Sequence, residues 1–227
     1  MMKPVLDLWC GSKSATQAWA DAGHEIISVD IDPEANPTIC KDILSVTVEE
    51  LQALAPDGFA FGWASPDCRV YSLMNMRWHR HWDKRNGWAY PATPEAIEAN
   101  ARLVWTCHLL TSLDLPYFVI ENPRAMMRKQ FFMTEFHRET VSYCQYGDDR
   151  MKPTDLFGNL PPAFFPKMCE NGSVTCDHRR APRGSASGTQ GMTQGDAQRV
   201  PLELSQAIYN ACMHSDGAQR MTLEDFA

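Results

Sequence analysis

Short apolar runs alternate with helix-like segments along the chain, and this alternation constrains the fold most strongly. The runs that we predict as strands are residues 5–6, 26–29, 59–63, 117–120 and 141–144. Helical patterns lie between them. Strands that alternate with helices favour a mostly parallel sheet with helices on both faces, and therefore an α/β fold.

Helix start signals support this reading. Thr47 and Glu50 are spaced as a capping box, which predicts a helix that runs to residue 54. Thr93 and Pro94 supply an N-cap and a proline at the first helical position. The helix that follows carries apolar residues at helical spacing, which we expect to face the core: Ile97, Ala101, Val104 and Leu109. Two further helices are predicted over 14–22 and 201–212.

Composition excludes several classes of protein. The 227 residues suffice for one α/β domain with a small appendage. No run of about 18 apolar residues occurs, so we expect no membrane span. The amino terminus lacks the apolar core of a signal peptide. The eight cysteines follow no disulfide-framework spacing, which favours reduced thiols and a cytoplasmic location.

Two predicted strands end in reactive side chains. Residues 59–63 lead into Ser65-Pro66-Asp67-Cys68, and residues 117–120 lead into Glu121-Asn122-Pro123. Strands of this kind could place the Cys68 thiol and the Glu121 carboxyl at one edge of the sheet. A thiol that adds to a ring and an acid that protonates a ring nitrogen are what alkylation of a pyrimidine carbon requires.

The first strand enters a glycine turn and a helix, and Asp30 ends the second strand. An acid at this position can accept hydrogen bonds from both ribose hydroxyls of a nucleotide-like cofactor. The turn has one glycine, Gly11, where a dinucleotide fingerprint has three. A sulfonium cofactor has no pyrophosphate to cradle, so this favours S-adenosylmethionine over NAD. The alternative is that Asp7 and Asp30 merely end strands.

A basic and aromatic segment, residues 69–90, stands out in a chain of net charge −7. Its cationic residues are Arg69, Arg77, Arg80, Lys84 and Arg85. We predict a mobile loop whose cations contact phosphates and whose tryptophans support an extruded base. The alternative is a solvated loop with its tryptophans packed on the core.

The later part of the chain offers candidate metal ligands. Cys169, Cys176 and His178 could supply three ligands to zinc, whereas a structural site needs four. Only Cys144 or Asp177 suggest themselves as the fourth. Because the usual paired short spacings are absent, the sequence predicts no metal site and leaves these residues as candidates.

Taken together, these motifs resemble the DNA cytosine-5 methyltransferases, particularly their short, phage-type members. Asp7-Leu8-Trp9-Cys10-Gly11 resembles the cofactor loop of this family, and 65–68 resembles its Pro-Pro-Cys nucleophile motif. Glu121-Asn122-Pro123 resembles Glu-Asn-Val, and 145–152 resembles an Arg-x-Arg motif with Lys152 as its second cation. Residues 198–208 resemble the last motif. The similarity covers residues 5–159 and 184–210 in the order of the family.

The resemblance implies a Rossmann-like S-adenosylmethionine-dependent methyltransferase fold, with a mostly parallel sheet and a very small target-recognition region. It implies catalytic roles for Cys68, Glu121, Arg150 and Lys152. The cofactor residues that it implies are Asp7, Leu8, Trp9, Cys10, Gly11, Asp30, Ile31, Asp42, Ile43 and Ser65. Asp67 departs from the pattern, since the family mostly has proline there. A carboxylate beside Cys68 disfavours the thiolate unless it points away.

The implied organisation has four parts. Residues 1–159 form the catalytic and cofactor-binding core, and 160–183 form a short target-recognition or metal segment. Residues 184–212 return to the core, and 213–227 form a tail. The gap at 160–183 is far shorter than the usual target-recognition domain.

The resemblance implies transfer of a methyl or modified alkyl group to C5 of cytosine in DNA, through a Cys68 adduct at C6 of a flipped base. The donor is S-adenosylmethionine or a carboxylated or otherwise modified analogue. We expect a monomer in the cytoplasm, that of the host if a phage encodes the chain. An RNA cytosine methyltransferase and a catalytically silent DNA-binding or cofactor-binding protein remain alternatives.

Overall fold

A seven-stranded sheet forms the centre of the computed structural model, which describes residues 2–72, 79–161, 165–170, 173–174, 176–179 and 198–214. The strand order is β3-β2-β1-β4-β7-β9-β8. The strands are β1 (Val5–Leu8), β2 (Ile26–Asp30), β3 (Ile39–Cys40), β4 (Phe61–Ala64), β7 (Phe118–Pro123), β8 (His137–Ser142) and β9 (Pro153–Gly158). The predicted α/β fold is confirmed.

The pairing in this sheet is parallel from β3 to β7 and becomes antiparallel on both sides of β9. From β1 the chain builds outward first through β2 and β3 and then, on the other side, through β4 and β7. The order therefore reverses between β1 and β4. In open α/β sheets, ligands bind at the carboxyl ends of the strands beside such a reversal.

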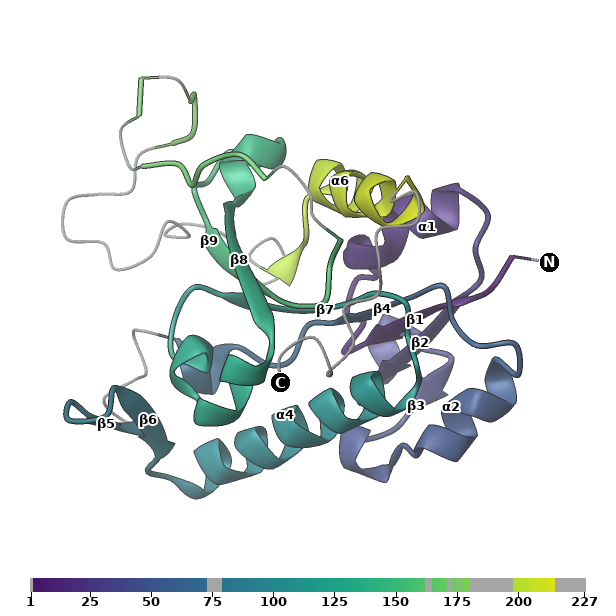
Figure 1. Ribbon diagram of the computed structural model, residues 1–227, viewed down its shortest axis with the longest axis horizontal. Coiled ribbons are helices and arrows are strands. Elements are labelled where there is room, and N and C mark those ends of the chain that lie inside the picture. Colours follow the sequence, from purple (N-terminus) through teal and green to yellow (C-terminus); the bar gives the residue numbers. More distant parts are fainter. Residues whose placement is uncertain are drawn as a thin grey trace, which may run out of the picture.

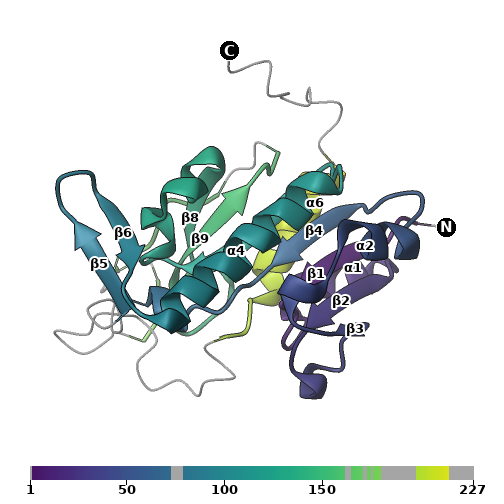
Figure 2. The same cartoon turned by 90° about the horizontal axis from the view of Figure 1, so that it is seen from below.

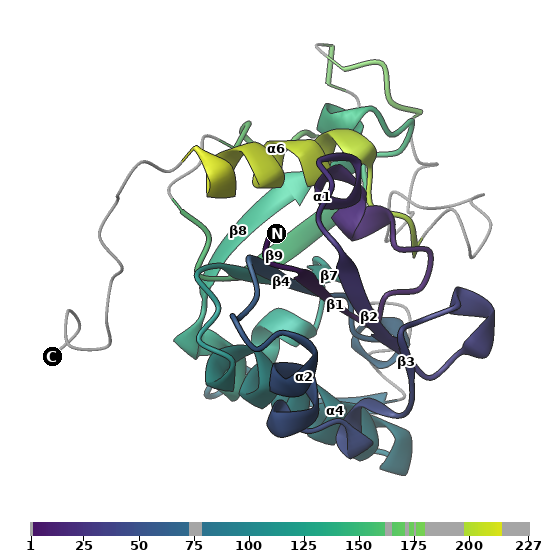
Figure 3. The same cartoon turned by 90° about the vertical axis from the view of Figure 1, so that its right-hand side faces the viewer.

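Helices cover both faces of the sheet (Figures 1 and 3). On one face lie α1 (Gln17–Asp21) and α6 (Leu202–Met213), and on the other lie α2 (Val48–Leu54) and α4 (Pro94–Ser112). Beneath α1, the ring of Trp19 stacks on that of Phe61 in β4, with centroids 4.2 Å apart. Nearly every residue of β1, β4 and β7 is buried. Successive side chains of a strand point to opposite faces, so both faces of the sheet must be covered by a core.

Single turns of 3-10 helix connect these elements: η1 (Ser14–Thr16), η2 (Pro33–Ala35), η3 (Ile43–Ser45), η4 (Arg69–Tyr71), η5 (Met127–Lys129), η6 (Phe131–Glu135) and η7 (Tyr143–Tyr146). Several of them occupy the carboxyl ends of strands, where the predicted site residues lie. Within the described ranges, no helix is both long and apolar enough to cross a membrane.

Both predicted helix starts are confirmed. The Thr47 hydroxyl accepts a hydrogen bond from the backbone N–H of Glu50 at 3.1 Å, and Thr93 accepts one from Ala96 at 3.3 Å. Of the four apolar residues at helical spacing in α4, only Leu109 is buried, because Ala101 is exposed, Ile97 is 58% exposed and Val104 is 48% exposed. The face that packs carries Ala96, Leu103, Thr106, Cys107, Leu109 and Leu110. It mixes small and weakly polar residues with leucines, so apolarity alone selected the wrong stripe.

Four strands were not predicted, namely β3, β5 (Arg80–Asp83), β6 (Trp88–Pro91) and β9. Strand β9 enters the sheet between β7 and β8, and β5 pairs with β6 in a separate antiparallel hairpin. This hairpin stands at the amino-terminal end of α4, away from the main sheet (Figure 2). The part of the predicted loop 69–90 that the structure describes is therefore largely ordered as η4 and the hairpin. The predicted strand 141–144 is shifted, since β8 ends at Ser142 and η7 follows.

Candidate active site

A cavity of about 550 Å³ opens at the carboxyl ends of the parallel strands, beside the reversal of strand order. Five of the predicted cofactor residues line it: Trp9, Asp30, Ile31, Asp42 and Ile43. Pro66 and Asp67, from the loop after β4, form the opposite wall. The cavity thus runs from the predicted cofactor residues to the predicted nucleophile motif.

Asp30 ends β2 at this cavity. Its two carboxylate oxygens accept hydrogen bonds from the backbone N–H groups of Gly11 and Asp32, both at 2.9 Å. These bonds fix the carboxylate between the turn after β1 and the turn after β2. Each oxygen keeps a lone pair for a further donor, such as a ribose hydroxyl.

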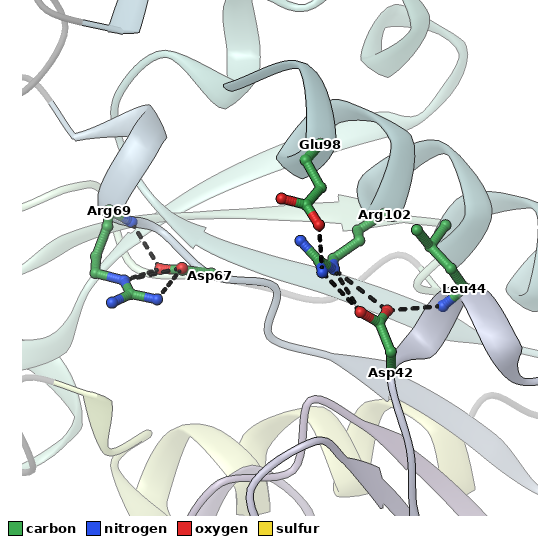
Figure 4. Close-up of polar contacts among 6 residues, drawn as sticks. All are labelled: Asp42, Leu44, Asp67, Arg69, Glu98 and Arg102. Carbon is green, nitrogen blue, oxygen red and sulfur yellow. Dashed lines mark hydrogen bonds and ion pairs between the residues drawn. The ribbon is translucent and has the colours of Figure 1, made fainter. Parts of the chain in front are cut away.

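Asp42 also lines the cavity and forms an ion pair with Arg102 of α4 (Figure 4). Arg102 Nη2 lies 2.6 Å from Asp42 Oδ2 and 2.8 Å from Glu98 Oε1. Hydrogen bonds from Arg102 are the main cause that lowers the pKa of the Asp42 carboxyl. This wall of the cavity is therefore a network of three charged side chains, and Arg102 and Glu98 were not foreseen from the sequence.

The remaining predicted cofactor residues, Asp7, Leu8, Cys10, Gly11 and Ser65, do not line the cavity. Leu8 is fully buried in the core. Asp7 is also buried and accepts a hydrogen bond from the Thr16 hydroxyl at 2.7 Å. Burial raises the pKa of Asp7 to about 7. The backbone N–H of Gly11 donates to the Asp30 carboxylate, so the loop after β1 positions a residue that lines the cavity.

Cys68 follows β4, at the same sheet edge. Asn122 of β7 donates a hydrogen bond from Nδ2 to the backbone carbonyl of Pro66 at 2.9 Å. Because Asn122 is adjacent to Glu121, this bond ties the loop that carries the thiol to the strand that carries the acid. The two motifs inferred to act together are thus joined directly.

Glu121 and Lys152 meet at this edge and are both buried, at 5% and 4% exposure. Lys152 Nζ lies 3.9 Å from Glu121 Oε1. The Tyr143 hydroxyl donates to the same oxygen at 3.0 Å, and Lys152 Nζ lies 4.4 Å from the centre of the Tyr143 ring. Burial, followed by the charge of Glu121, raises the pKa of the Tyr143 hydroxyl, so Tyr143 stays a neutral donor.

These charges act on Cys68. Burial is the main cause that raises the pKa of the Cys68 thiol, and the carboxylate of Glu121 raises it further. Lys152 acts in the opposite direction and stabilises the thiolate. The resting site therefore holds a protonated thiol. Protonation of Glu121, or its neutralisation by a bound base, favours the thiolate.

Asp67, the residue that departs from the family pattern, is held by Arg69 (Figure 4). The Arg69 guanidinium bonds both oxygens of Asp67 at 2.7–3.0 Å, and the Arg69 backbone N–H adds a bond at 2.9 Å. Burial alone would raise the pKa of Asp67, but these bonds hold it below its usual range. Arg69 thus holds Asp67 as a paired carboxylate, and the charge of Asp67 still raises the pKa of the Cys68 thiol, after burial and the charge of Glu121.

Arg150 does not join the acid. Its backbone N–H bonds Asp148, and its guanidinium Nε lies 3.8 Å from Asp149 Oδ1. Of the two predicted cations in this motif, Lys152 is the one that the structure brings to Glu121.

The basic segment divides into two groups. Lys84 and Arg85 are exposed at the hairpin turn, where Arg85 pairs with Asp83 at 2.9 Å. Arg80 is only 4% exposed, so its guanidinium is enclosed by the protein and does not face solvent. Its guanidinium donates to Val70 O, Asn100 Oδ1 and Gln130 Oε1 and lies over the Tyr71 ring. Arg77 lies outside the described residues.

The candidate metal ligands Cys169, Cys176 and His178 lie together with Cys144 in a second cluster. Asp177 is exposed and is not part of it. Sequence reasoning also missed Tyr143 and Asn122 as supports of the acid. Asn122 could have been found, since it adjoins Glu121 in the matched motif, whereas nothing in the sequence around Tyr143 marks its partner.

The sheet order, the single antiparallel strand β9 and the cavity at the reversal define the Rossmann-like fold of S-adenosylmethionine-dependent methyltransferases. No family model matches the chain. A Frog virus 3 (isolate Goorha) protein named "Probable DNA (cytosine-5)-methyltransferase" is 26% identical over 227 residues, which cover 92% of this chain and 99% of that protein. The resemblance to the DNA cytosine-5 methyltransferases is thus confirmed along most of the chain.

Among solved structures, the chain is similar to an E. coli protein described as a "putative DNA modification methyltransferase encoded within prophage Cp". The TM-score is 0.51 at 18% identity, over 74% of this chain and 52% of that one. The chain therefore spans about half the length of this solved structure. At this identity the similarity supports the fold.

Proposed function

We propose that the chain transfers a methyl group to C5 of cytosine in DNA through a covalent adduct of Cys68. The observation that carries the proposal is the arrangement of Cys68, Glu121 and Lys152 at one sheet edge, beside a cavity that contains Asp30. The name of the viral relative, which is similar over most of its length, points to the same activity.

The residues divide the work as follows. The Cys68 thiolate adds to C6 of the ring, which makes C5 nucleophilic. Glu121 accepts the proton that the Cys68 thiol releases, hydrogen-bonds the exocyclic amine and passes that proton to N3, so that the adduct carries no full negative charge. Tyr143 and Lys152 hold the carboxyl in place, and Lys152 also favours the thiolate. Loss of the C5 proton and departure of the thiol then release the modified base.

The cavity fits S-adenosylmethionine. Its volume lies within the roughly 300–1,000 Å³ of small-molecule sites. Asp30 offers an acceptor for ribose hydroxyls, and Trp9, Ile31 and Ile43 offer apolar surface for a base. When bound there, S-adenosylmethionine supplies the electrophilic methyl group. The chain's contribution is to bind it at the carboxyl edge, next to the loop that carries Cys68.

We further propose duplex DNA as the partner, with the target base flipped out of the stack, because a cytosine that is still paired and stacked cannot reach a half-buried thiol. The exposed cations of the hairpin are the described candidates for phosphate contacts. We propose that the protein works as a monomer in the cytoplasm, where reduced thiols persist.

Trapping on duplexes that contain 5-fluorocytosine tests the proposal. Fluorine at C5 blocks release of the thiol, so we expect a covalent protein–DNA adduct that depends on S-adenosylmethionine. Cys68→Ser should give no adduct, because a hydroxyl is a far weaker nucleophile at neutral pH. Cys40→Ser, which removes an exposed cysteine outside the site, should react like the unmodified chain.

Parallel reactions on RNA of the same sequence, with mass analysis of the nucleosides, separate the alternatives. Adducts on RNA alone would redirect the proposal to an RNA substrate. Absence of any adduct from a folded protein that binds the cofactor would indicate a catalytically silent protein. A mass increment other than one methyl would identify a modified donor.

Calorimetry on Asp30→Asn tests the cofactor site. Loss of the charged acceptor should weaken S-adenosylmethionine binding by roughly 1–3 kcal/mol. Asp32→Asn is the matched control, because Asp32 lies two residues away and does not line the cavity. Unchanged affinity in Asp30→Asn would exclude Asp30 from the site.

A further inference from the structure

Three sulfur atoms and one imidazole nitrogen lie close together outside the proposed active site. Cys144, Cys169, Cys176 and His178 each contribute one atom, and all four atoms lie within 4.8 Å of one another. His178 Nδ1 is 3.2 Å from Cys176 Sγ and 3.6 Å from Cys169 Sγ. In a tetrahedral zinc site, bonds of about 2.3 Å to sulfur and about 2.0 Å to nitrogen place neighbouring ligand atoms roughly 3.5–3.8 Å apart. The observed separations therefore need only small shifts to surround one ion.

The chemistry of the set selects the ion. Three thiols and one imidazole form a closed Cys₃His set, which is typical of structural zinc sites. Soft thiolate ligands disfavour magnesium and calcium, which prefer oxygen. We propose that the chain binds one structural Zn²⁺ through the Sγ atoms of Cys144, Cys169 and Cys176 and through Nδ1 of His178. The three thiols release their protons to solvent as the three Zn–S bonds form, and no electron is transferred.

The segment that supplies three of the ligands is irregular in the residues that the structure describes, and Phe165 and the buried Cys169 and His178 join it to the core. Its described residues, within 165–179, include no helix or strand, and Val174 is 97% exposed. Its polar ties to the core include the Cys169 N–H, which donates to Ser142 Oγ, and Gln145, which donates to Lys167 O at 2.7 Å. A short irregular segment of this kind gains further order from a metal ion.

The fourth ligand gives the ion a defined place in the molecule. Cys144 belongs to η7 and directly follows Tyr143, which donates its hydroxyl to Glu121. The ion therefore fastens segment 165–179 to the turn that supports the proposed catalytic acid. This role goes beyond the proposed function and does not depend on it, because a structural ion binds whether or not the chain methylates DNA.

Metal analysis of the full-length protein, purified under reducing conditions and freed of loose metal, tests the site. We expect one zinc per chain. Cys144→Ser, Cys169→Ser, Cys176→Ser and His178→Ala should each weaken zinc binding by more than about 100-fold, the upper end of what loss of an outer-shell partner costs. Cys40→Ser and Cys212→Ser remove cysteines outside the cluster and should keep the ion.

His178→Cys preserves four ligands and should retain zinc, which separates loss of a ligand from general damage. If a serine variant fails to fold, Co²⁺ replacement in the unmodified chain provides a second measurement. We expect visible absorption typical of tetrahedral cobalt, with thiolate charge-transfer bands. Tryptic cleavage after Lys167 and Arg179 should accelerate when a chelator removes the ion.

Three results would overturn the proposal. One is a folded protein without bound zinc that shows no tetrahedral spectrum with cobalt. A second is a zinc content that the four variants share with the two controls. The third is a disulfide between two of the three cysteines in protein kept under reducing conditions; all eight cysteines are free in the structure.

Discussion

The Tyr143 hydroxyl is one of two groups that hold the proposed catalytic acid, Glu121, in place; the other is the Lys152 ammonium group. Tyr143 donates to Glu121 Oε1 at 3.0 Å, and its ring lies beside the ammonium group of Lys152. Phenylalanine keeps the ring and its contact with the cation but removes the donor. Tyr143→Phe therefore isolates the contribution of one hydrogen bond to the position of Glu121.

We expect Tyr143→Phe to lower turnover by roughly 10-fold, the lower end of the 1.5–3 kcal/mol that a bond to a charged group contributes. Affinity for S-adenosylmethionine should not change. Steady-state kinetics on duplex DNA measure both quantities. Tyr146→Phe is the matched control, because the buried Tyr146 hydroxyl has no hydrogen-bond partner within the described residues. Equal effects of the two substitutions would show that the bond to Glu121 does not matter.

Asp7 makes the stability of the fold depend on pH. Its carboxyl titrates near 3.8 when solvated and near pH 7 in the folded chain, mainly because it is buried. Between these values the folded chain keeps a proton that the unfolded chain has released. The contribution of Asp7 to stability is therefore present at low pH and is lost as the pH rises toward 7.

Asp7→Asn cannot ionise and still offers an oxygen to the Thr16 hydroxyl. Its free energy of unfolding should exceed that of the unmodified chain by a margin that grows from about pH 4 to about pH 7. Urea unfolding across this range measures the margin. Asp57→Asn, at an exposed position, should show no such trend. A margin that stays constant with pH would mean that Asp7 is ionised throughout.

At this scale the sequence predicted the placement of Cys68 and Glu121 at one sheet edge better than it predicted the side chains that contact them. Cys68 and Glu121 end apolar runs, and parallel strands place such ends at one edge. Tyr143 and Arg102 could not be inferred, because each meets its partners only after distant elements have packed. Cys144 was one of two guesses for a fourth metal ligand, and the structure places it, and not Asp177, beside the other three. The position of Lys152 also depends on β9, an antiparallel strand whose pairing the sequence does not mark.

Among the secondary-structure elements, the β5–β6 hairpin differs most from expectation. The charge pattern of residues 69–90 predicted one cationic loop, but folding buries Arg80 against Tyr71, Asn100 and Gln130. Charge counts along a sequence cannot separate an exposed cation from one that is enclosed by acceptors. The exposed charges of the hairpin are Lys84 and Arg85 at its turn.

Salt dependence of DNA binding tests this division. Each phosphate contact contributes about −0.9 to the slope of log affinity against log salt concentration. Replacing Lys84 and Arg85 together by alanine should flatten the slope by up to about two units under the same counting. Cofactor affinity should not change, because neither residue lines the cavity.

Two other variants sharpen the result. Lys3→Ala removes an exposed cation that precedes β1, at the opposite edge of the sheet, and should leave the slope unchanged. Arg80→Ala should lower the melting temperature, since it removes a buried guanidinium from three acceptors. If Arg80→Ala flattened the slope of log affinity against log salt concentration more than the double variant does, Arg80 would be part of the DNA interface.

At the scale of the whole molecule, a complete α/β core is combined with little additional chain. The core positions the cavity, Cys68 and Glu121 at one sheet edge. The chain covers 99% of its viral relative but only 52% of the prophage protein of known structure. We propose that residues 160–183, the predicted target-recognition segment, and the hairpin region supply the contacts that read bases.

The small length of chain outside the α/β core predicts that the target sequence is short or loosely defined. One good bidentate contact to a base discriminates by about 1–3 kcal/mol, and few such contacts fit on so little chain. Deep bisulfite sequencing of a randomised duplex library, treated with the protein and S-adenosylmethionine, would determine the preferred site. We expect methylation to depend on only a few base pairs around the target cytosine.

Replacing Lys84 and Arg85 should lower methylation evenly across all sequences, because contacts to phosphates carry no base information. A strict site of about six or more base pairs would contradict the prediction, since discrimination would then need more base contacts than this small region offers.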